Sequence, residues 1–321
     1  MRLPAGDNRD LILTRAGPKS LHPGWLAPKE GEQRFDLIVL SYGPTPLAYD
    51  RTDFGHIEIP GHKVAGYGAF LRNHSNIIER YDQVAMIDDD IEADYNTLAR
   101  AFELGRSHNL KIWQPSLSSK SYFSYAAHLD QSGGCKPRYI NFVEMMCPFF
   151  QSATLLEMSN LFMIGAETGI DVLWSCILGE DPWALAVLDG VTVTHARPVG
   201  LLKSMNGFQA SYNDYIQRVL HQFDVRRFPG AIPIGFPPQH NPTAIVRLRL
   251  ALSALNVISA IRETPMPKKL FVQALLAGLR QILIKDTRIF GRPAIILERA
   301  KQYAAANSRA MALGDGAAEL R

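Results

Sequence analysis

The chain has 321 residues, of which 47% are hydrophobic and 20% are charged, and this is enough apolar material for a large core. The composition excludes a disordered or a fibrous protein. The three cysteines, Cys135, Cys147 and Cys176, are odd in number and widely spaced, and no C-x-x-C sequence occurs. This pattern argues against a disulfide framework or a zinc knuckle, and it is typical of small buried side chains in a reducing compartment.

The net charge of +3 is unevenly distributed along the chain. From residue 225 to the end there are 15 Lys and Arg against 5 Asp and Glu, whereas the preceding part carries 19 basic and 26 acidic residues. Such asymmetry favours two modules with different surroundings. We predict an α/β domain over residues 1–225, a Pro-rich linker over 226–243 and a basic helical region over 244–321. No secretory signal and no apolar run of membrane-spanning length are visible, which makes the cytoplasm the expected location.

Short apolar runs that end in turn residues predict strands buried on both faces of a sheet. Residues 11–14 and 35–40 form the first two runs, and each is followed by a turn sequence that contains glycine and proline. A third run, residues 83–87, ends in three aspartates. Further strands are expected at residues 111–115, 139–146, 187–188 and 191–195, the last two on either side of a turn at Asp189-Gly190.

Helical apolar spacing occurs at residues 65–80 and 95–106, and again in the tail at 244–262 and 270–285. Strands that alternate with helices are typical of α/β proteins. We therefore predict a mostly parallel, Rossmann-like sheet with helices on both faces, followed by a C-terminal helical appendage.

Three consecutive aspartates, Asp88, Asp89 and Asp90, follow the third predicted strand. In open α/β sheets, ligands bind at the carboxyl ends of the strands. Adjacent carboxylates repel one another unless a cation relieves them, and Mg²⁺ or Mn²⁺ would do so while also holding a diphosphate. The alternative is that Asp90 or Asp94 only caps the following helix. Capping uses one aspartate and leaves two unexplained.

An Asp-x-Asp after two strand–turn units resembles the GT-A type of nucleotide-sugar glycosyltransferase. More closely, the chain resembles an uncharacterised family of plant and bacterial proteins described as glycosyltransferase-like. The resemblance covers about the first two-thirds of the chain and leaves out the tail. The matching segments are residues 14–17, 20–23, 35–37, 41–43, 87–91, 113–115, 142–146, 169–171 and 189–195.

The resemblance implies a GT-A fold and metal-dependent transfer of a sugar from a UDP- or GDP-type donor to a glycan or lipid-linked acceptor, in cell-surface polysaccharide synthesis. It implies that Asp88 and Asp90 bind Mn²⁺ or Mg²⁺ and that His195 is the third ligand. Neutral imidazole is a competent Mn²⁺ ligand. Taken alone, His195 alternates with Val191 and Val193, and a satisfied core or edge histidine explains it equally well.

The turns after the first two strands would lie at the same edge of the sheet and could hold the nucleotide. Glycine lets a backbone approach a ligand, tyrosine can stack on a base, and a cation can neutralise phosphate. An ordinary strand–helix turn explains each residue equally well when it is taken singly, and no G-x-G-x-x-G or Walker A sequence is present. The candidate nucleotide ligands are Arg15, Gly17, Tyr42, Gly43, Lys63 and Asp89.

A transferase that inverts the anomeric centre also needs a base for the acceptor hydroxyl, and Glu144 and Asp171 are the candidates. Glu144 lies in a predicted apolar strand, where a charge is costly unless it has a partner or a task. The alternatives for Glu144 are an ion pair with an arginine or exposure on an edge strand. Asp171 lies between a loop and a predicted helix, and helix capping explains it equally well.

Basic residues are interleaved with apolar ones throughout the tail. Such helices could lie on the inner face of an anionic membrane, although amphipathic helices more often pack on their own domain. No nucleic-acid-reading motif is present, so we expect no nucleic-acid partner. The basic residues concerned are Arg247, Arg249, Arg262, Lys268, Lys269, Arg280, Lys285, Arg288 and Arg292.

Two other functions stay open at this point. The first is a metal-dependent nucleotidyltransferase, phosphotransferase or hydrolase that uses the same aspartates on a diphosphate. The second is a non-catalytic sugar-binding protein that keeps the fold.

Overall fold

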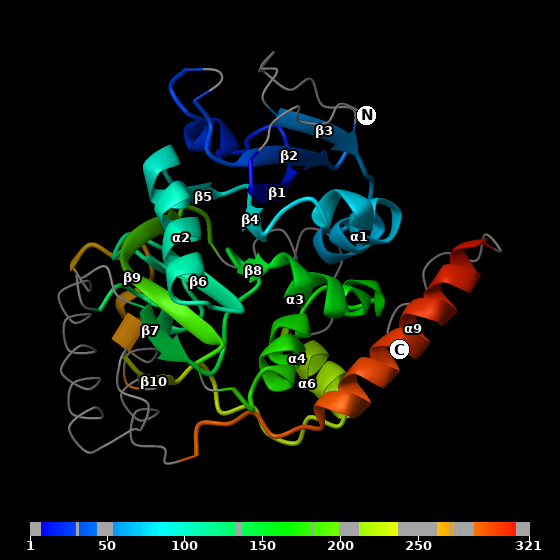
Figure 1. The fold of residues 1–321 in the computed structure, drawn as a ribbon. Helices are drawn as coiled ribbons and strands as arrows, with labels where there is room; N and C mark the ends of the chain where they lie inside the picture. The colour runs from blue at the N-terminus through cyan, green and yellow to red at the C-terminus, as the bar shows by residue number, and fades with distance from the viewer. Residues whose placement is uncertain are drawn as a thin grey trace.

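The protein folds as one large sheet covered by helices on both faces (Figure 1). A computed structural model describes residues 8–29, 32–43, 54–131, 137–181, 183–198, 212–236, 262–269, 271–272, 276 and 286–312. The strands are β1 (Asp10–Ala16), β2 (Asp36–Ser41), β3 (Phe54–Glu58), β4 (Gln83–Asp88), β5 (Ile91–Glu92), β6 (Ile112–Leu117), β7 (Pro137–Ile140), β8 (Phe149–Gln151), β9 (Leu185–His195) and β10 (Pro233–Gly235).

The sheet has the strand order β10-β7-β9-β6-β8-β4-β1-β2-β3, and β5 pairs with the end of β9. β1 pairs in parallel with β2 and β4, β2 with β3, and β6 with β9. β8 runs antiparallel between β4 and β6, and β7 runs antiparallel between β9 and β10. Seven of the nine strands in this order therefore point the same way, which confirms the predicted, mostly parallel sheet.

Helices cover both faces because alternate residues of the central strands point to opposite sides. In β1, Leu11 and Leu13 join a core that includes residues of α1, α3, α4, α6 and α9, whereas Ile12 joins a second core that includes residues of α2. The helices are α1 (Lys63–Ile78), α2 (Tyr95–Ser107), α3 (Ser152–Glu157), α4 (Ile170–Ile177), α6 (Tyr212–Gln222) and α9 (Pro293–Ala312), with short 3-10 helices η1 (His22–Trp25), η2 (Ala126–His128) and η3 (Ser159–Met163).

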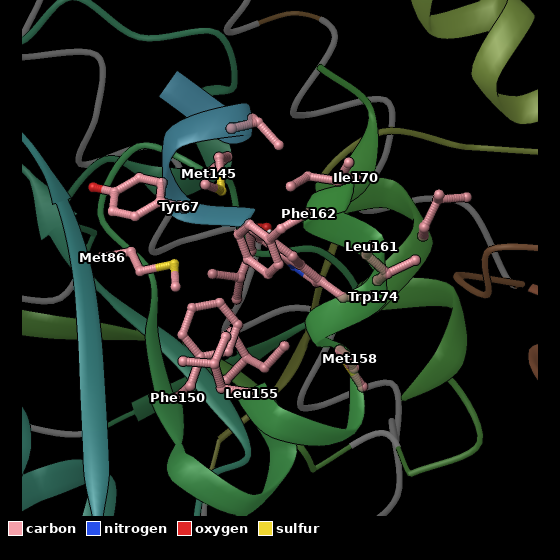
Figure 2. Close-up of a cluster of buried hydrophobic side chains, with 14 of the residues drawn as sticks. Tyr67, Met86, Met145, Phe150, Leu155, Met158, Leu161, Phe162, Ile170 and Trp174 are labelled. Atoms are coloured by element: carbon pink, nitrogen blue, oxygen red, sulfur yellow. Dashed lines mark hydrogen bonds between the residues drawn. The ribbon is translucent and has the colours of Figure 1, made fainter. Parts of the chain in front are cut away.

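Trp174 of α4 lies at the centre of the first core and anchors a loop to it. Its ring contacts Phe150 and Phe162, with centroid separations of 5.4 and 6.1 Å. Its indole N–H donates to the carbonyl of Val143 at 3.1 Å. Figure 2 shows Met145, from the same loop, among the side chains of this core. The loop after β7 is thereby fixed to the hydrophobic interior.

Two predicted strands differ from the observed ones. The predicted strand 139–146 is wrong beyond Ile140, because β7 ends there and residues 141–148 form a loop. Its apolar side chains reflect burial in the core rather than pairing in the sheet. The predicted turn at Asp189-Gly190 is also wrong, because β9 continues through it. The register with β6 shifts there instead, with Gly190 at φ +80°.

The structure describes only part of the predicted linker and appendage, so the predicted division of the chain stays a prediction. Within the predicted linker, Ala231 and Ile232 are buried and β10 pairs with β7. Further on, Ile296 and Ala300 of α9 pack into the first core. No described helix is long and apolar enough to cross a membrane. Residues 237–261 and most of the predicted tail helices lie outside the described residues, and these include Arg247, Arg249, Arg280 and Lys285.

A buried ion pair joins β7 to β9. Arg138 Nε lies 2.8 Å from Asp189 Oδ2, and Nη2 lies 2.9 Å from Oδ1, with both side chains fully buried. Arg138 also donates to the carbonyls of Ala127 at 2.6 Å and Leu129 at 3.0 Å. The pair therefore links the sheet to the η2 segment.

We expect Arg138→Met to lower the free energy of unfolding by roughly 3–5 kcal/mol, because it would leave a buried carboxylate without its cation. Urea unfolding followed by circular dichroism measures this change. Arg100→Met is the control, since it removes an exposed pair with Glu103 and should cost less than about 1 kcal/mol. Equal effects of the two substitutions would contradict the prediction.

Candidate functional site

The predicted site residues converge where parallel strands end. Arg15 pairs in register with Asp88, and Ala16 with Ser41, so the turns after β1 and β2 lie beside the aspartates that follow β4. Parallel strands place their carboxyl ends at one edge, where open α/β sheets bind ligands. Gly17 and Tyr42 therefore share this edge with the three aspartates.

Asp88, the last residue of β4, forms an ion pair with Lys63, the first residue of α1. Lys63 Nζ lies 2.5 Å from Oδ1 and 2.7 Å from Oδ2, and it also donates to the carbonyl of Met145 at 2.8 Å. The two side chains are 27% and 22% exposed, Lys63 being the more open. Burial raises the pKa of Asp88 to about 6, and Lys63 opposes this rise while Asp90 adds to it.

Asp89 fixes the turn after β1 rather than pointing to Lys63. Its Oδ2 accepts from the backbone amide of Gly17 at 3.0 Å, and its Oδ1 lies 3.4 Å from Arg197 Nη1. Arg197 also donates to the carbonyl of Lys19. Burial raises the pKa of Asp89, against the opposing effects of the Gly17 amide and Arg197. These contacts hold the β1 turn against the end of β9.

Asp90 faces His195 across the short β5–β9 ladder, in which Ile91 pairs with His195. His195 Nε2 lies 3.3 Å from Asp90 Oδ1, and Nδ1 lies 2.9 Å from the carbonyl oxygen of Tyr122. Both ring nitrogens therefore face acceptors, which favours the protonated imidazole. Burial alone would lower the pKa of His195, but Asp90 outweighs it and raises this pKa above its ordinary value.

The three predicted metal ligands lie close together but do not form a metal site in this arrangement. Lys63 engages both oxygens of Asp88, and His195 faces Asp90 as a cation. A metal ligand must offer a free lone pair, and a histidine ligand must be neutral. Among the described residues, no group of three or more His, Cys, Asp or Glu side chains is placed to hold a metal ion. The residues therefore do not fit Mn²⁺ or Mg²⁺ as they stand, and metal binding stays a prediction.

Arg15 and Tyr42 form a stacked pair at the ends of β1 and β2. The Arg15 guanidinium is 1% exposed and donates to the carbonyls of Ile59 at 2.6 Å and Gly61 at 2.7 Å. The Tyr42 ring lies 4.3 Å from the guanidinium and is 41% exposed. Arg15 therefore supports the β3–α1 connection from inside. Tyr42 and the adjacent Gly43 remain available to a ligand.

Both predicted bases are joined to Asp88 through the backbone of residues 143–146. The amide of Glu144 donates to Gln114 Oε1 at 3.0 Å, and the amide of Met145 donates to Asp171 Oδ2 at 3.4 Å. The amide of Asp88 donates to the carbonyl of Met146 at 3.0 Å. The segment therefore brings the two acids and the Lys63–Asp88 pair to one place.

Glu144 is buried in the loop after β7, where the prediction had a strand. Its Oε1 accepts from Ser124 Oγ at 2.8 Å, and its Oε2 lies 3.4 Å from His128 Nδ1. The alternative drawn from the sequence was an ion pair with an arginine, whereas the side chain that faces Glu144 is His128. Asp171 lies in the first turn of α4, and its Oδ1 accepts from the amide of Val172 at 3.0 Å. The N-cap of α4 is Gly169, so Asp171 does not cap the helix in the way that the alternative expected.

Several supporting residues were not singled out from the sequence. Glu167 accepts from the amides of Val64 at 2.8 Å and Ala65 at 2.9 Å, so it caps α1 from about a hundred residues away. No local pattern reveals such a contact. Arg197 could have been found by its position two residues beyond His195. His128 carries no periodic or motif pattern in the sequence.

Glu144 gives a testable dependence of stability on pH. Burial alone would raise its pKa, but His128 and Ser124 outweigh it and lower the pKa below the ordinary value of 4.5. A carboxylate with a lowered folded-state pKa stabilises the fold above its unfolded pKa and loses this effect as pH falls through the folded one. We expect Glu144→Gln to cost about 1–3 kcal/mol at neutral pH. This cost should shrink as pH falls below 4.5.

Urea unfolding of both proteins over a series of pH values measures this dependence. Glu157→Gln, at an exposed position on α3, is the matched control and should change stability little at any pH. A cost of Glu144→Gln that stays constant from neutral to acidic pH would contradict the lowered pKa assigned to Glu144.

No protein-family model matches the chain, and no curated protein matches it in sequence. Similar solved structures include S. aureus TarS 1-349, with 11% identity and a TM-score of 0.40 over 94% of this chain and 91% of that one. The complex of TarS 1-349 with UDP-GlcNAc has 11% identity and a TM-score of 0.42 over 94% of this chain and 92% of that one. A197 from STIV has 15% identity and a TM-score of 0.33 over 57% of this chain and 82% of that one. Values this low do not establish a shared function, so function has to be argued from this chain's own residues.

Proposed function

We propose that the chain is a glycosyltransferase that takes a sugar from a UDP- or GDP-type donor and transfers it to a hydroxyl of a glycan or lipid-linked acceptor, in the synthesis of a cell-surface polysaccharide. One observation carries the proposal. The backbone of residues 143–146 links a partly exposed cation, Lys63, to two buried carboxylates, Glu144 and Asp171, at the carboxyl edge of the sheet. Charge neutralisation and proton removal, the two requirements of sugar transfer, are thereby supplied together.

The donor diphosphate would lie against Lys63 and the nucleotide base against Tyr42. The first amides of α1 at Val64 and Ala65 already bind Glu167, so the ammonium rather than the helix terminus meets the phosphate. Tyr42 offers an exposed ring on which a base can stack, and the Arg15 guanidinium packs against this ring.

We assign proton removal to Asp171 and positioning to Glu144. Glu144 has a lowered pKa, which weakens it as a base; its Oε1 accepts from Ser124, and its Oε2 faces His128. Asp171 takes the proton of the acceptor hydroxyl while the hydroxyl oxygen attacks the anomeric carbon. The bond from that carbon to the diphosphate oxygen breaks, and its electron pair leaves with the nucleoside diphosphate next to Lys63. Retention of configuration at this carbon would contradict the assignment.

Membrane contact is carried forward as a prediction. The sequence also predicts a divalent ion at Asp88, Asp90 and His195, but Lys63 and His195 already face these carboxylates, so no step of the transfer is assigned to a metal ion. The basic tail would bring the enzyme from the cytoplasm to lipid-linked acceptors, as the sequence predicts. Within the described part of the tail, Arg288 pairs with Asp286 and Arg292 with Asp224.

The proposal is tested by incubating the full chain with a panel of UDP- and GDP-sugars, each with Mn²⁺ or with EDTA, and with sugar and lipid-linked acceptors. UDP-GlcNAc belongs in the panel. Release of a nucleoside diphosphate is the expected result. Release of a nucleoside monophosphate would instead support action on the diphosphate itself, and saturable binding without turnover would support a sugar-binding protein.

With an active donor, we expect Asp171→Asn to lower kcat by about 10²–10⁴-fold, because a positioned base contributes that much. Donor affinity, measured by calorimetry, should change less than about twofold, since the contacts with the donor lie elsewhere. Glu157→Gln serves as the control with unchanged kcat. An Asp171→Asn enzyme with full kcat would move the role of base to Glu144 or to water.

A further inference from the structure

Lys63 is the cation on which the candidate donor site is centred. Its ammonium lies within 2.8 Å of three oxygens, the two of Asp88 and the carbonyl of Met145. A divalent ion held by Asp88 would need the same carboxylate oxygens. Lysine presents a compact point charge with three donors and so suits this role. The chain itself therefore supplies a cation for the Asp88 carboxylate at the end of β4.

The start of α1 is held on both sides, which keeps Lys63 in place. Before it, the carbonyls of Ile59 and Gly61 bind the buried Arg15 guanidinium. After it, the amides of Val64 and Ala65 bind Glu167. An added Cβ at Gly66 would lie 2.3 Å from Arg15 Cζ, so Arg15 and α1 are closely packed. The Lys63 side chain itself remains 27% exposed, which leaves its ammonium partly accessible to a ligand.

We propose that Lys63 is the built-in cation of the donor site, so that a nucleoside diphosphate binds without a divalent ion and Asp88 binds such an ion tightly only when Lys63 is removed. The first half rests on the proposed function, whereas the second half concerns the chain and the metal alone. Two cations within a few ångströms repel strongly in a partly buried site. A divalent ion at Asp88 therefore has to displace the ammonium.

Neighbouring side chains reinforce this exclusion. Arg197 lies 3.4 Å from Asp89 and His195 lies 3.3 Å from Asp90, so each of the three consecutive aspartates already faces a basic side chain. Of these three basic side chains, Lys63 alone contacts both oxygens of its aspartate and also a carbonyl oxygen. Removing its charge consequently frees more oxygen ligands than removing either of the others.

The experiment uses the full chain and four variants. Lys63→Met removes the charge, Lys63→Arg keeps it, and Lys63→Gln keeps a hydrogen-bond donor without charge and repeats the test if the methionine variant unfolds. Lys111→Met is the matched control, because Lys111 pairs with Gln151 at 2.8 Å beside the start of β6, away from the strand ends that form the site. Thermal unfolding shows which variants are folded. Calorimetry then measures binding of Mn²⁺ alone, and of UDP and GDP in EDTA.

For Mn²⁺ alone, we expect Lys63→Met to bind at least about tenfold more tightly than the unmodified chain. For UDP or GDP in EDTA, we expect it to bind at least about tenfold more weakly, with recovery on addition of Mn²⁺. Lys111→Met should behave as the unmodified chain does, and Lys63→Arg, which keeps the positive charge, should bind Mn²⁺ more weakly than Lys63→Met does.

Equal Mn²⁺ affinity in the unmodified chain and in Lys63→Met would overturn the proposal. A strict requirement for Mn²⁺ in nucleotide binding by the unmodified chain would overturn it as well. If neither nucleotide binds any variant with or without metal, the proposed function fails, while the Mn²⁺ comparison still decides whether Lys63 excludes the ion. The two failures are therefore distinguishable.

Discussion

The backbone of residues 143–146 is the feature on which the site depends. A buried loop must find partners for its amides and carbonyls, and here they come from side chains or backbone of four other elements. Trp174 belongs to the first core, whereas Lys63, Asp88 and Asp171 belong to the candidate site, so the hydrophobic interior helps to set the positions of the candidate site residues. The partners in chain order are Trp174 on Val143, Gln114 on Glu144, Asp171 and Lys63 on Met145, and the amide of Asp88 on Met146.

Electrostatics explains why three adjacent carboxylates are compatible with a stable fold. Asp88, Asp89 and Asp90 each meet a different cation, contributed by α1, by the residues after β9, and by β9 itself. The sequence showed that a cation was needed, and a metal ion was one way to supply it. The folded chain supplies protein cations instead, which reduces the repulsion without leaving any of the three charges buried and unpaired.

The central sheet could be predicted from the sequence, but its periphery could not. Continuous apolar runs identify β1, β2 and β4, because strands buried on both faces have no polar alternation. β8 has only three residues and pairs with two strands distant in sequence, so no local pattern distinguishes it. The helix α9 could have been expected from Pro293 at its first turn and the alanine-rich sequence after it. The apolar run after β7 was misassigned, since burial in a loop and burial in a sheet select the same side chains.

The candidate site shows the same division between what a sequence specifies and what folding adds. A charge in an apolar segment implies a partner, and this held for Glu144, whose partner proved to be His128 rather than an arginine. Coulomb attraction depends on distance in space and not on separation in the chain. The sequence can therefore predict that a buried charge needs a partner, but it cannot identify that partner. The same limit applies to Lys63. Its positive charge predicted an anionic partner, but only the folded structure shows that this partner is Asp88. A diphosphate that binds here therefore has to share the Lys63 ammonium with Asp88.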